Sequence, residues 1–254
     1  MSAAARDAKG HAAPALVACD LDRTLLDETG EPYAGIVAAL ATLTAAGVRV
    51  VLATGRTVAA TRGAALRLGL PPGDTIAYHG AVIADLRDGR WLERHDLPPG
   101  AALALAAALL DAGAEVSAYV DDERWDQDRC DDFAAALQGV AVTRLVVGGA
   151  TAELLASLAA GHPNVAVSAA PGGRLELHHA AADKATALAR LCARRGVARA
   201  GAVACGDGAP DAGMLRWAGL GIAVAEGAAA ARAAADLVVP RAELPGVLSG
   251  LVEG

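Results

Sequence analysis

The sequence predicts an α/β protein in which helices cover both faces of a parallel sheet and a second α/β module interrupts the chain. Short, continuous apolar runs alternate with helical stretches, which is the pattern of βαβ units. This alternation changes after about residue 83 and resumes near residue 179. Apolar residues make up 54% of the 254 residues and aromatic residues only 3%, so small aliphatic side chains must build the core.

The first part of the predicted core covers residues 15–83. Its helices end at natural stop signals: the first at Gly47, a typical C′ residue, and the second before Pro71 and Pro72. The strands are continuous apolar runs, as expected where both faces of a parallel sheet are covered. The predicted elements are strand 15–20, helix 33–47, strand 48–55, helix 57–70 and strand 75–83.

Residues 84–178 form the predicted insert. An Arg-Asp-Gly turn at 87–89 separates two strand-like runs, which favours an antiparallel hairpin. A Pro-Gly-Gly segment at 171–173 separates the last two strand-like runs of the insert. The remaining predicted elements are helix 101–113, strand 115–120, a charged stretch at 121–132, helix 133–137, strand 143–149, helix 151–161 and strands 164–170 and 174–180.

The alternation of strands and helices resumes in residues 179–254, which complete a Rossmann-like core of three layers. Residues 1–14 are predicted to be a flexible N-terminal tail. The predicted elements of the second core segment are helix 183–195, strand 202–207, helix 210–219, strand 221–226, helix 227–235 and strand 236–239.

Composition excludes several classes of function. The 29 acidic and 22 basic residues give a net charge of −7, the wrong sign for neutralising nucleic-acid phosphates. The longest apolar run, from Ala101, is half the length of a bilayer crossing, and the N-terminus lacks the apolar stretch of a secretory signal. The four cysteines form no CxxC pair, which favours reduced, buried thiols. We therefore expect a soluble, cytoplasmic protein that binds neither nucleic acid nor membranes; no particular oligomeric state is indicated.

Chemically reactive side chains follow three of the predicted strands. The first strand runs into Asp20 and Asp22, the second into Thr54, and a later one into Asp207 and Asp211. In a parallel α/β sheet, ligands bind beyond the carboxyl ends of the strands. We therefore expect these groups to converge on one edge of the sheet, together with Lys184, which begins the helix before the later strand.

This convergence favours phosphoryl chemistry with a metal ion. Carboxylates that are clustered without a cation repel one another, and oxygen ligands at a hydrophilic edge suit Mg²⁺. A carboxylate can also act as the nucleophile in phosphoryl transfer, so one of Asp20 and Asp22 can attack while the other moves a proton. Each motif alone has a structural interpretation as a turn, a helix cap or a solvated lysine. However, only two of the 22 basic residues are lysines, which favours a function for Lys184.

Four segments resemble the successive motifs of the haloacid dehalogenase-like phosphohydrolases. They are ACDLDRTLLD, VVLATGR, LELHHAAADKATAL and ACGDGAPDAGMLRWAGLGIAVAEG. The resemblance runs from about Leu16 to the C-terminus, and the insert resembles the type IIB cap of the Cof-type subfamily. It implies a catalytic core, a cap that selects the substrate, and Mg²⁺ as the cofactor.

The resemblance also implies a role for each strand-end residue. Asp20 is the implied nucleophile and Asp22 the implied general acid/base. Thr54, Gly55 and Lys184 are implied to bind the phosphoryl group. The implied metal ligands are Asp20, the backbone carbonyl of Asp22, Asp207 and Asp211.

Three positions depart from the family pattern. Arg23 stands where the family usually has Gly, and His79 and Pro210 each stand where it usually has Asn. Arg23, His79 and the nearby Arg56 are therefore candidate substrate contacts. In the insert, Arg124 and Trp125 follow an apolar strand and are candidates for binding the leaving group; the alternative is a solvated turn with a packed tryptophan. The candidate substrate residues are Arg23, Arg56, His79, Arg124 and Trp125.

The leading functional hypothesis is a Mg²⁺-dependent phosphatase acting through an aspartyl-phosphate on a small phosphorylated metabolite, with a sugar phosphate as one candidate. A phosphosugar mutase is a second hypothesis, because related folds also transfer phosphoryl groups. A non-catalytic phosphoacceptor, such as a signalling receiver domain, is a third. Two features argue against this third hypothesis: the pair of aspartates, Asp20 and Asp22, after the first strand, and the inserted module.

Overall fold

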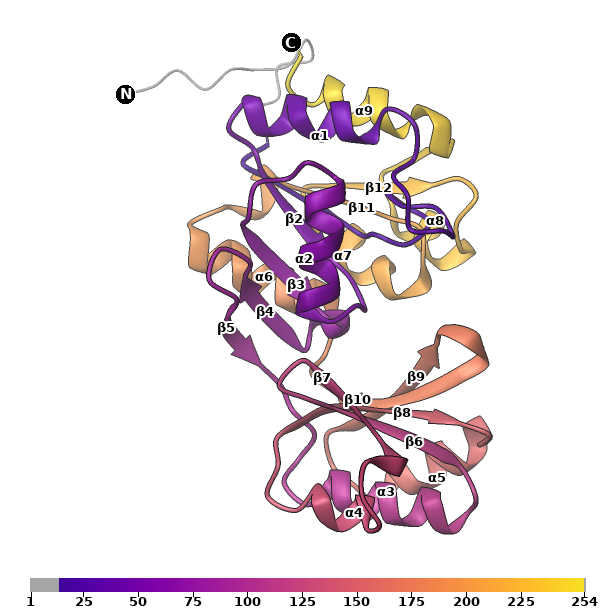
Figure 1. Ribbon diagram of the computed structural model, residues 1–254. Helices are drawn as coiled ribbons and strands as arrows, with labels where there is room; N and C mark the ends of the chain where they lie inside the picture. Colours follow the sequence, from indigo (N-terminus) through magenta and orange to yellow (C-terminus); the bar gives the residue numbers. More distant parts are fainter. Residues whose placement is uncertain (1–13, 254) are drawn as a thin grey trace. The chain divides into compact units, whose positions relative to one another are not determined.

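The computed structural model describes residues 14–253 and shows two compact units (Figure 1). The core unit contains the residues up to Leu92 together with those from Asp183 onward, and the insert unit is Glu93–Ala182. Apart from Pro14, the predicted tail lies outside the described residues. None of the helices in the described part of the chain has the length and apolar character of a transmembrane span.

An eight-stranded sheet forms the centre of the core unit, in the order β13-β12-β11-β1-β2-β3-β4-β5. The strands from β13 to β3 are parallel, and β4 pairs antiparallel with β3. The bounds are β1 Leu16–Cys19, β2 Arg49–Ala53, β3 Asp74–Ala77, β4 Val82–Asp85, β5 Arg90–Arg94, β11 Ala202–Gly206, β12 Leu220–Val224 and β13 Leu237–Val239.

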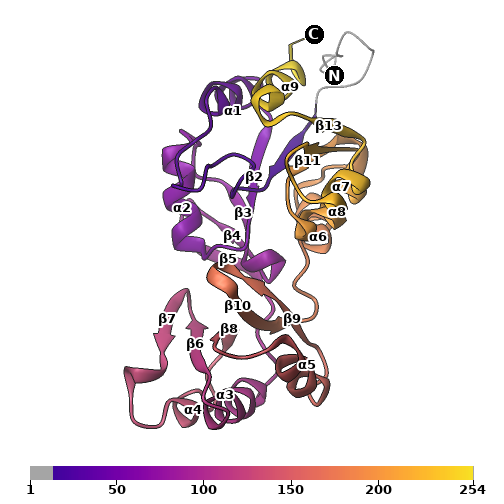
Figure 2. The same cartoon turned by 90° about the vertical axis from the view of Figure 1, so that its right-hand side faces the viewer.

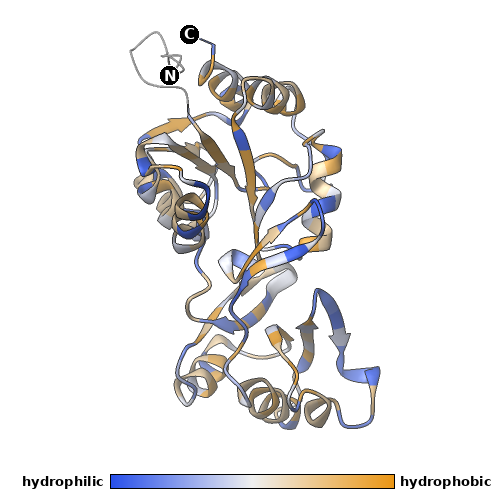
Figure 3. Ribbon diagram, turned by 90° about the vertical axis from the view of Figure 1, so that its left-hand side faces the viewer, coloured by the Kyte–Doolittle hydropathy of each residue, from blue (hydrophilic) through white to orange (hydrophobic). Residues whose placement is uncertain are grey.

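Helices cover both faces of this sheet, which confirms the predicted three-layer α/β core. Figure 2 shows α1, α2 and α9 on one side of the sheet and α6, α7 and α8 on the other. Strand β1 is fully buried between its neighbours, and in Figure 3 the central strands are coloured hydrophobic. The helix bounds are α1 Ile36–Ala45, α2 Val58–Arg67, α6 Lys184–Arg195, α7 Ala212–Trp217, α8 Ala229–Ala234 and α9 Leu244–Gly250.

Local sequence signals fix where α6 begins and ends. The Asp183 carboxylate accepts a hydrogen bond from the Thr186 backbone N–H at 2.7 Å, which is an N-cap. At the other end, Gly196 adopts the left-handed conformation that commonly ends helices. The buried residues Ala187, Leu188, Leu191 and Cys192 pack against the sheet. These contacts position Lys184, the first residue of α6.

The insert unit is built on a five-stranded antiparallel sheet, in the order β7-β6-β8-β10-β9. Three helices cover one face of this sheet, and Leu105, Leu145 and Leu177 are fully or almost fully buried between the layers. The bounds are α3 Ala101–Asp111, β6 Glu115–Val120, β7 Glu123–Asp126, α4 Phe133–Ala136, β8 Val142–Gly148, α5 Ala152–Ala160, β9 Val165–Ala170 and β10 Arg174–His179.

The boundaries of the insert differ from the predicted 84–178. The hairpin of β4 and β5 belongs to the core sheet, because β4 is fully buried and pairs with β3 from Asp74↔Asp85 to Ala77↔Val82. An antiparallel strand on the edge of a parallel sheet is common, so the hairpin signal at residue 84 does not mark a domain boundary. The charged stretch 121–132 also contains a strand, β7, which the sequence did not predict.

Candidate active site

Three buried carboxylates meet at the carboxyl edge of the core sheet. Asp20 follows β1, Asp207 follows β11, and Asp211 ends the short 3-10 helix Ala209–Asp211. One oxygen of each lies within 4.8 Å of the others, and each residue is at most 7% exposed. We call these three residues the acid cluster. The predicted convergence of Asp20, Asp207 and Asp211 is present in the structure.

Lys184 places its ammonium group between two members of the acid cluster. Its Nζ donates to Asp20 Oδ1 at 2.7 Å and to Asp211 Oδ1 at 2.6 Å, and the residue is 3% exposed. Burial lowers the pKa of Lys184, but the charges of Asp20 and Asp211 outweigh this effect and leave the pKa above its ordinary value. The lysine is therefore a permanent cation inside the site.

Two members of the acid cluster, Asp20 and Asp207, have a raised pKa. Burial, together with repulsion from Asp211 and Asp207, raises the pKa of Asp20 to about 7 against the opposing attraction of Lys184. Burial also raises the pKa of Asp207. For both groups, burial is the largest cause of the raised pKa.

Thr24 is a member of the site that the sequence analysis did not identify. Its hydroxyl lies 3.1 Å from Asp20 Oδ2 and 3.3 Å from Asp207 Oδ1. The residue is fully buried, and the chain between Asp20 and Thr24 turns back on itself through a hydrogen bond from Leu25 N to Leu21 O. The sequence feature that could have identified Thr24 is its position four residues after Asp20, because a tight turn there brings its side chain back to the end of the strand.

The loop that carries Asp207 is held by Asp211. Asp211 Oδ2 accepts hydrogen bonds from the backbone N–H groups of Asp207 at 3.1 Å and Gly208 at 2.8 Å. A Cβ on Gly206 would lie 2.6 Å from the Asp211 side chain, so this position requires glycine. Pro210 lies in the first turn of the short helix, where a proline needs no N–H partner.

Asp22 does not join the acid cluster through its side chain. Strand β1 ends at Cys19 and the backbone turns at Arg23, so the alternation that would keep Asp20 and Asp22 on one face is lost. The Asp22 side chain is 54% exposed and forms a two-pronged ion pair with Arg56, whose Nε donates at 3.1 Å. The structure therefore places Arg56 against Asp22.

Thr54 and Gly55 lie at the carboxyl end of β2, next to β1. Thr54 is fully buried, and its hydroxyl accepts a hydrogen bond from the Arg56 backbone N–H at 3.2 Å. A Cβ on Gly55 would lie 2.2 Å from the His79 ring, so glycine makes room for that ring. His79 has φ 55°, a left-handed conformation in which His, like Asn, is enriched. This preference explains why histidine can replace the usual asparagine.

Arg23 also occupies a left-handed position, with φ 61°. This conformation explains why the family usually has glycine there. Its Nε lies 3.4 Å from Asp207 Oδ2, and its carbonyl accepts a hydrogen bond from Arg241 Nε at 2.9 Å. Arg241, which the sequence analysis did not identify, thus supports the loop that carries Arg23.

The two insert candidates have partners within their own unit. Arg124 donates to Asp126 at 2.7 Å and to the Ser117 hydroxyl at 3.1 Å. Trp125 packs against the apolar core of the insert, and Arg129 lies over its ring at 4.4 Å. These contacts fit the structural interpretation of Trp125, and the substrate roles of both residues stay predictions.

A glycine lets the start of α6 approach the neighbouring loop. A Cβ on Gly80 would lie 2.4 Å from the Asp183 carbonyl oxygen. We expect Gly80→Ala to lower the free energy of unfolding by about 1–3 kcal/mol more than Gly47→Ala. Both glycines have positive φ, but Gly47 has open space around it and serves as the control. Urea denaturation measures both; equal losses would contradict the close approach.

The acid cluster has the composition of a divalent cation site. Its three carboxylates face two cationic side chains, Lys184 inside and Arg23 at the rim, so one negative charge remains when all are ionised. Only the carboxylate oxygens of these groups can ligate a cation, because an ammonium and a guanidinium have no lone pair to offer. An all-oxygen set with few protein ligands is the type that Mg²⁺ uses. The residues present therefore fit a magnesium ion.

Comparisons with known proteins identify the family of this chain. The family model of the haloacid dehalogenase-like hydrolases matches residues 17–139 and 149–251. The phosphoglycolate phosphatase of Pyrobaculum neutrophilum is 33% identical over 222 residues, which cover 87% of this chain and 86% of that protein.

Two solved structures share the fold. A haloacid dehalogenase-like hydrolase from Bacteroides thetaiotaomicron has a TM-score of 0.79 at 23% identity, covering 94% of this chain and 98% of that chain. The subclass IIB sugar phosphatase BT4131 has a TM-score of 0.77 at 18% identity, with the same coverage. Both similarities extend over the core and the insert. The match of the family model and the 33% identity over most of the chain show that this protein belongs to the haloacid dehalogenase-like hydrolases.

Proposed function

We propose that this hydrolase is a Mg²⁺-dependent phosphatase that acts on a small phosphorylated metabolite through an aspartyl-phosphate on Asp20. The observation that carries the proposal is the Asp20 carboxylate, held by Lys184 and Thr24 beside two further buried acids. A carboxylate held in this way presents an oxygen in a fixed direction, which is what attack on phosphorus requires. The 33% identity to a phosphoglycolate phosphatase supports the same reaction.

The proposed reaction has two steps. An oxygen of Asp20 forms a bond to phosphorus while the bond from phosphorus to the ester oxygen breaks, and Asp22 gives its proton to the departing alcohol. Water then attacks the phosphorus of the aspartyl-phosphate and gives a proton to Asp22, while the bond from phosphorus to the Asp20 oxygen breaks; inorganic phosphate leaves and the Asp20 carboxylate is restored. The exposed position of Asp22 at the edge of the site supports this exchange of protons with substrate and water.

The other polar groups bind and orient the phosphoryl group. We propose that Thr54, Gly55 and Lys184 contact its oxygens, because all three lie at the carboxyl edge near β1. The proposed metal ligands are Asp20, the backbone carbonyl of Asp22, Asp207 and Asp211. When bound there, Mg²⁺ supplies positive charge that offsets the negative charge of the carboxylates and the phosphoryl oxygens.

Substrate choice is proposed to come from the insert unit and from the arginines at the rim of the core. Loops on a rigid scaffold commonly carry specificity, and Arg124 and Trp125 are the insert candidates. In the core, Arg23 and Arg56 are the cationic candidates, and either could pair with a second anionic group of the substrate. Phosphoglycolate is therefore the first ester to test, with sugar phosphates next.

The mutase and phosphoacceptor hypotheses make different predictions. A mutase converts one phosphosugar into another without net release of inorganic phosphate, so product analysis separates it from a phosphatase. A phosphoacceptor is phosphorylated by a small phosphodonor without turnover. Membership of a hydrolase family over both segments of the core favours the phosphatase.

Removal of the metal tests the proposed function. We expect EDTA followed by dialysis to lower phosphate release at least about tenfold, and added Mg²⁺ to restore it, because several kcal/mol of charge stabilisation would be lost. High Ca²⁺ should inhibit, since its larger and looser coordination shell misplaces the attacking oxygen. Phosphate release from a panel of phosphate esters is the measurement, and circular dichroism controls for the fold. Full activity after chelation would refute the metal-dependent reaction.

A further inference from the structure

Two cationic side chains lie against the acid cluster, and the structure holds them very differently. Lys184 is buried between Asp20 and Asp211, with hydrogen bonds of 2.7 and 2.6 Å. Arg23 lies at the rim, where its Nε is 3.4 Å from Asp207 Oδ2. The Arg23 side chain is 62% exposed, whereas the Asp207 side chain is 4% exposed. The buried acid is therefore paired with a side chain that lies mostly in solvent.

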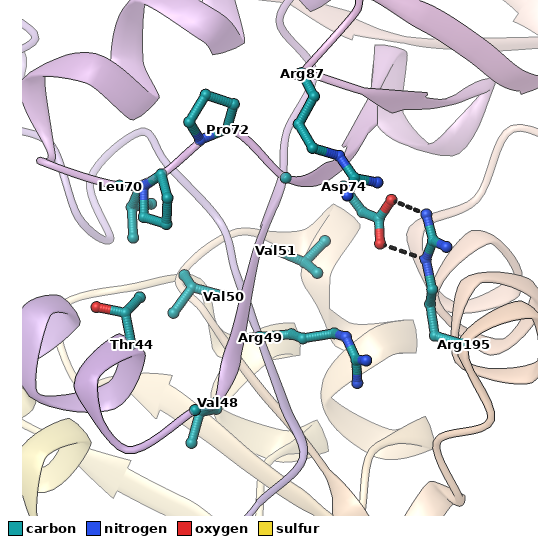
Figure 4. Close-up of a pocket in the computed structure, with 13 residues that line it drawn as sticks. Thr44, Val48, Arg49, Val50, Val51, Leu70, Pro72, Asp74, Arg87 and Arg195 are labelled. Atoms are coloured by element: carbon teal, nitrogen blue, oxygen red, sulfur yellow. Dashed lines mark hydrogen bonds and ion pairs between the residues drawn. The ribbon is translucent and has the colours of Figure 1, made fainter.

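The contact between Arg23 and Asp207 is weaker than a structural ion pair of the core unit. Arg195, at the end of α6, donates two hydrogen bonds to the Asp74 carboxylate at 2.6 and 2.7 Å (Figure 4). A two-pronged pair of this kind fixes both partners. Arg23 instead approaches Asp207 through one nitrogen, and within residues 14–253 its guanidinium forms an ion pair with no other acid. A single contact made by an exposed side chain contributes little and is easily broken.

The backbone of Arg23 is nevertheless held beside the cluster. Its carbonyl accepts a hydrogen bond from Arg241 Nε at 2.9 Å, and the Arg241 guanidinium lies 5.0 Å from the centre of the Tyr33 ring. The backbone N–H of Arg241 donates to the Glu226 carboxylate at 3.0 Å. The loop therefore presents the Arg23 side chain at a defined point of the rim, while the guanidinium itself has only the contact with Asp207.

The charge of Arg23 acts on the same carboxylate that fits a divalent cation. Burial raises the pKa of Asp207, and Arg23 is the strongest of the neighbouring charges that act on this acid, in the direction that lowers the pKa. Two cations that share one carboxylate repel each other, and at a separation of about 4–6 Å this repulsion is considerable. A divalent cation ligated by Asp207 must therefore bind against the charge of Arg23 or move its guanidinium into solvent.

We propose that Arg23 is a displaceable counter-ion of the acid cluster, which offsets the charge of Asp207 in the metal-free protein and weakens the binding of a divalent cation. The exposure of its guanidinium suits this role, because the group can leave Asp207 and be hydrated at once. Lys184 cannot act in this way, since it is buried and donates to two acids. The inference rests on the proposed metal site, but not on the phosphatase reaction.

Binding of Mn²⁺ to the full-length protein tests the inference without any substrate. Mn²⁺ takes the oxygen ligands that suit Mg²⁺, and the electron paramagnetic resonance signal of the free ion gives the Kd. Arg23→Gln removes the charge but keeps a side chain at the same positive φ. We expect it to bind Mn²⁺ at least about tenfold more tightly than the wild type. Arg23→Lys keeps the charge, so its Kd should stay within about threefold of the wild-type value.

Stability in the absence of metal should change in the opposite sense. Without the charge of Arg23, the three acids have less positive charge to offset their mutual repulsion. The urea midpoint of Arg23→Gln in EDTA should therefore lie below the midpoints of the wild type and of Arg23→Lys. Saturating Mn²⁺ should remove most of this difference, because tighter binding to the folded state stabilises the variant more.

Arg194→Gln is the matched control, because it removes the same charge from an exposed position about 15 Å along α6 from Lys184. Salt screens a charge at this distance, so neither the Kd for Mn²⁺ nor the urea midpoint should change. Equal or weaker binding of Mn²⁺ by Arg23→Gln would overturn the inference, and so would equally tight binding by Arg23→Gln and Arg23→Lys. A wild type that binds no Mn²⁺ would refute the proposed metal site, and this inference with it.

Discussion

Asp20→Asn is expected to lower kcat at least about a thousandfold while the fold is retained, because an amide does not attack phosphorus. The substitution keeps the shape of the side chain. Its amide oxygen can still accept a hydrogen bond from Lys184, which also keeps its 2.6 Å contact with Asp211. The measurement is phosphate release under saturating Mg²⁺ from whichever ester of the panel is the best substrate.

The same variant should be more stable than the wild type at pH 8 in the absence of divalent cations. The folded state raises the pKa of Asp20 to about 7, whereas the unfolded chain has an ordinary value of about 4. Between these values the folded state holds a proton that the unfolded state lacks, so wild-type stability falls as the pH rises from about 4 to 7. The advantage of Asp20→Asn should therefore grow across this range and vanish at its acid end, as measured by urea unfolding in EDTA.

Asp128→Asn is the matched control, because it removes one carboxylate at an exposed position of the insert unit. It should change neither kcat nor the pH dependence of stability. If Asp20→Asn kept more than a few per cent of the wild-type rate, covalent catalysis through Asp20 would be wrong. If the stability of Asp20→Asn changed with pH as that of the wild type does, the raised pKa of Asp20 would not be the cause of the pH dependence.

Lys184→Arg is expected to lower kcat about a hundredfold with only a modest rise in KM. The substitution keeps the positive charge, but the site has little room for a larger group. The ammonium lies 2.7 Å from one carboxylate oxygen and 2.6 Å from another, and the residue is 3% exposed. A planar guanidinium is wider and cannot occupy the same point between Asp20 and Asp211. A displacement of about 1 Å in such a site costs about a hundredfold in rate.

Arg194→Lys provides the converse control near the other end of α6. This arginine is exposed, so exchanging the two cations there should leave kcat within about twofold of the wild type. Steady-state kinetics measure both variants. A Lys184→Arg enzyme within the same range would show that the reaction needs only the charge of Lys184 and not the position of its ammonium group.

The acid cluster was predictable because one rule of topology governs it. Asp20 and Asp207 directly follow strands that are neighbours in the sheet, and parallel strands place their carboxyl ends at one edge. The apolar runs identified those strands, so the convergence of the acids followed without any knowledge of side-chain geometry. The placement of Lys184 followed in the same way from the start of α6.

The details that were missed depend on turns rather than on strands. The side chains of Asp22 and Thr24 are placed by the backbone beyond Cys19, where Arg23 adopts a positive φ and reverses which side chains face the cluster. Hydrophobic periodicity carries no information about such a turn. The hairpin of β4 and β5 was assigned to the insert for a related reason: periodicity identifies a strand, but not the sheet to which it belongs.

The position of β1 between β2 and β11 determines when the site can form during synthesis. Cys19 pairs with Leu52 on one side and with Cys205 on the other, so one partner follows within about 35 residues and the other only after the whole insert has been made. At a ribosomal rate of about 5–20 residues per second, β11 is synthesised roughly 10–40 seconds after β1, and one edge of β1 stays unpaired until then. During that time an apolar strand with unpaired backbone groups is open to other chains. Nascent chains of this protein therefore expose this edge of β1, beside Asp20, until the residues of β11 have been made.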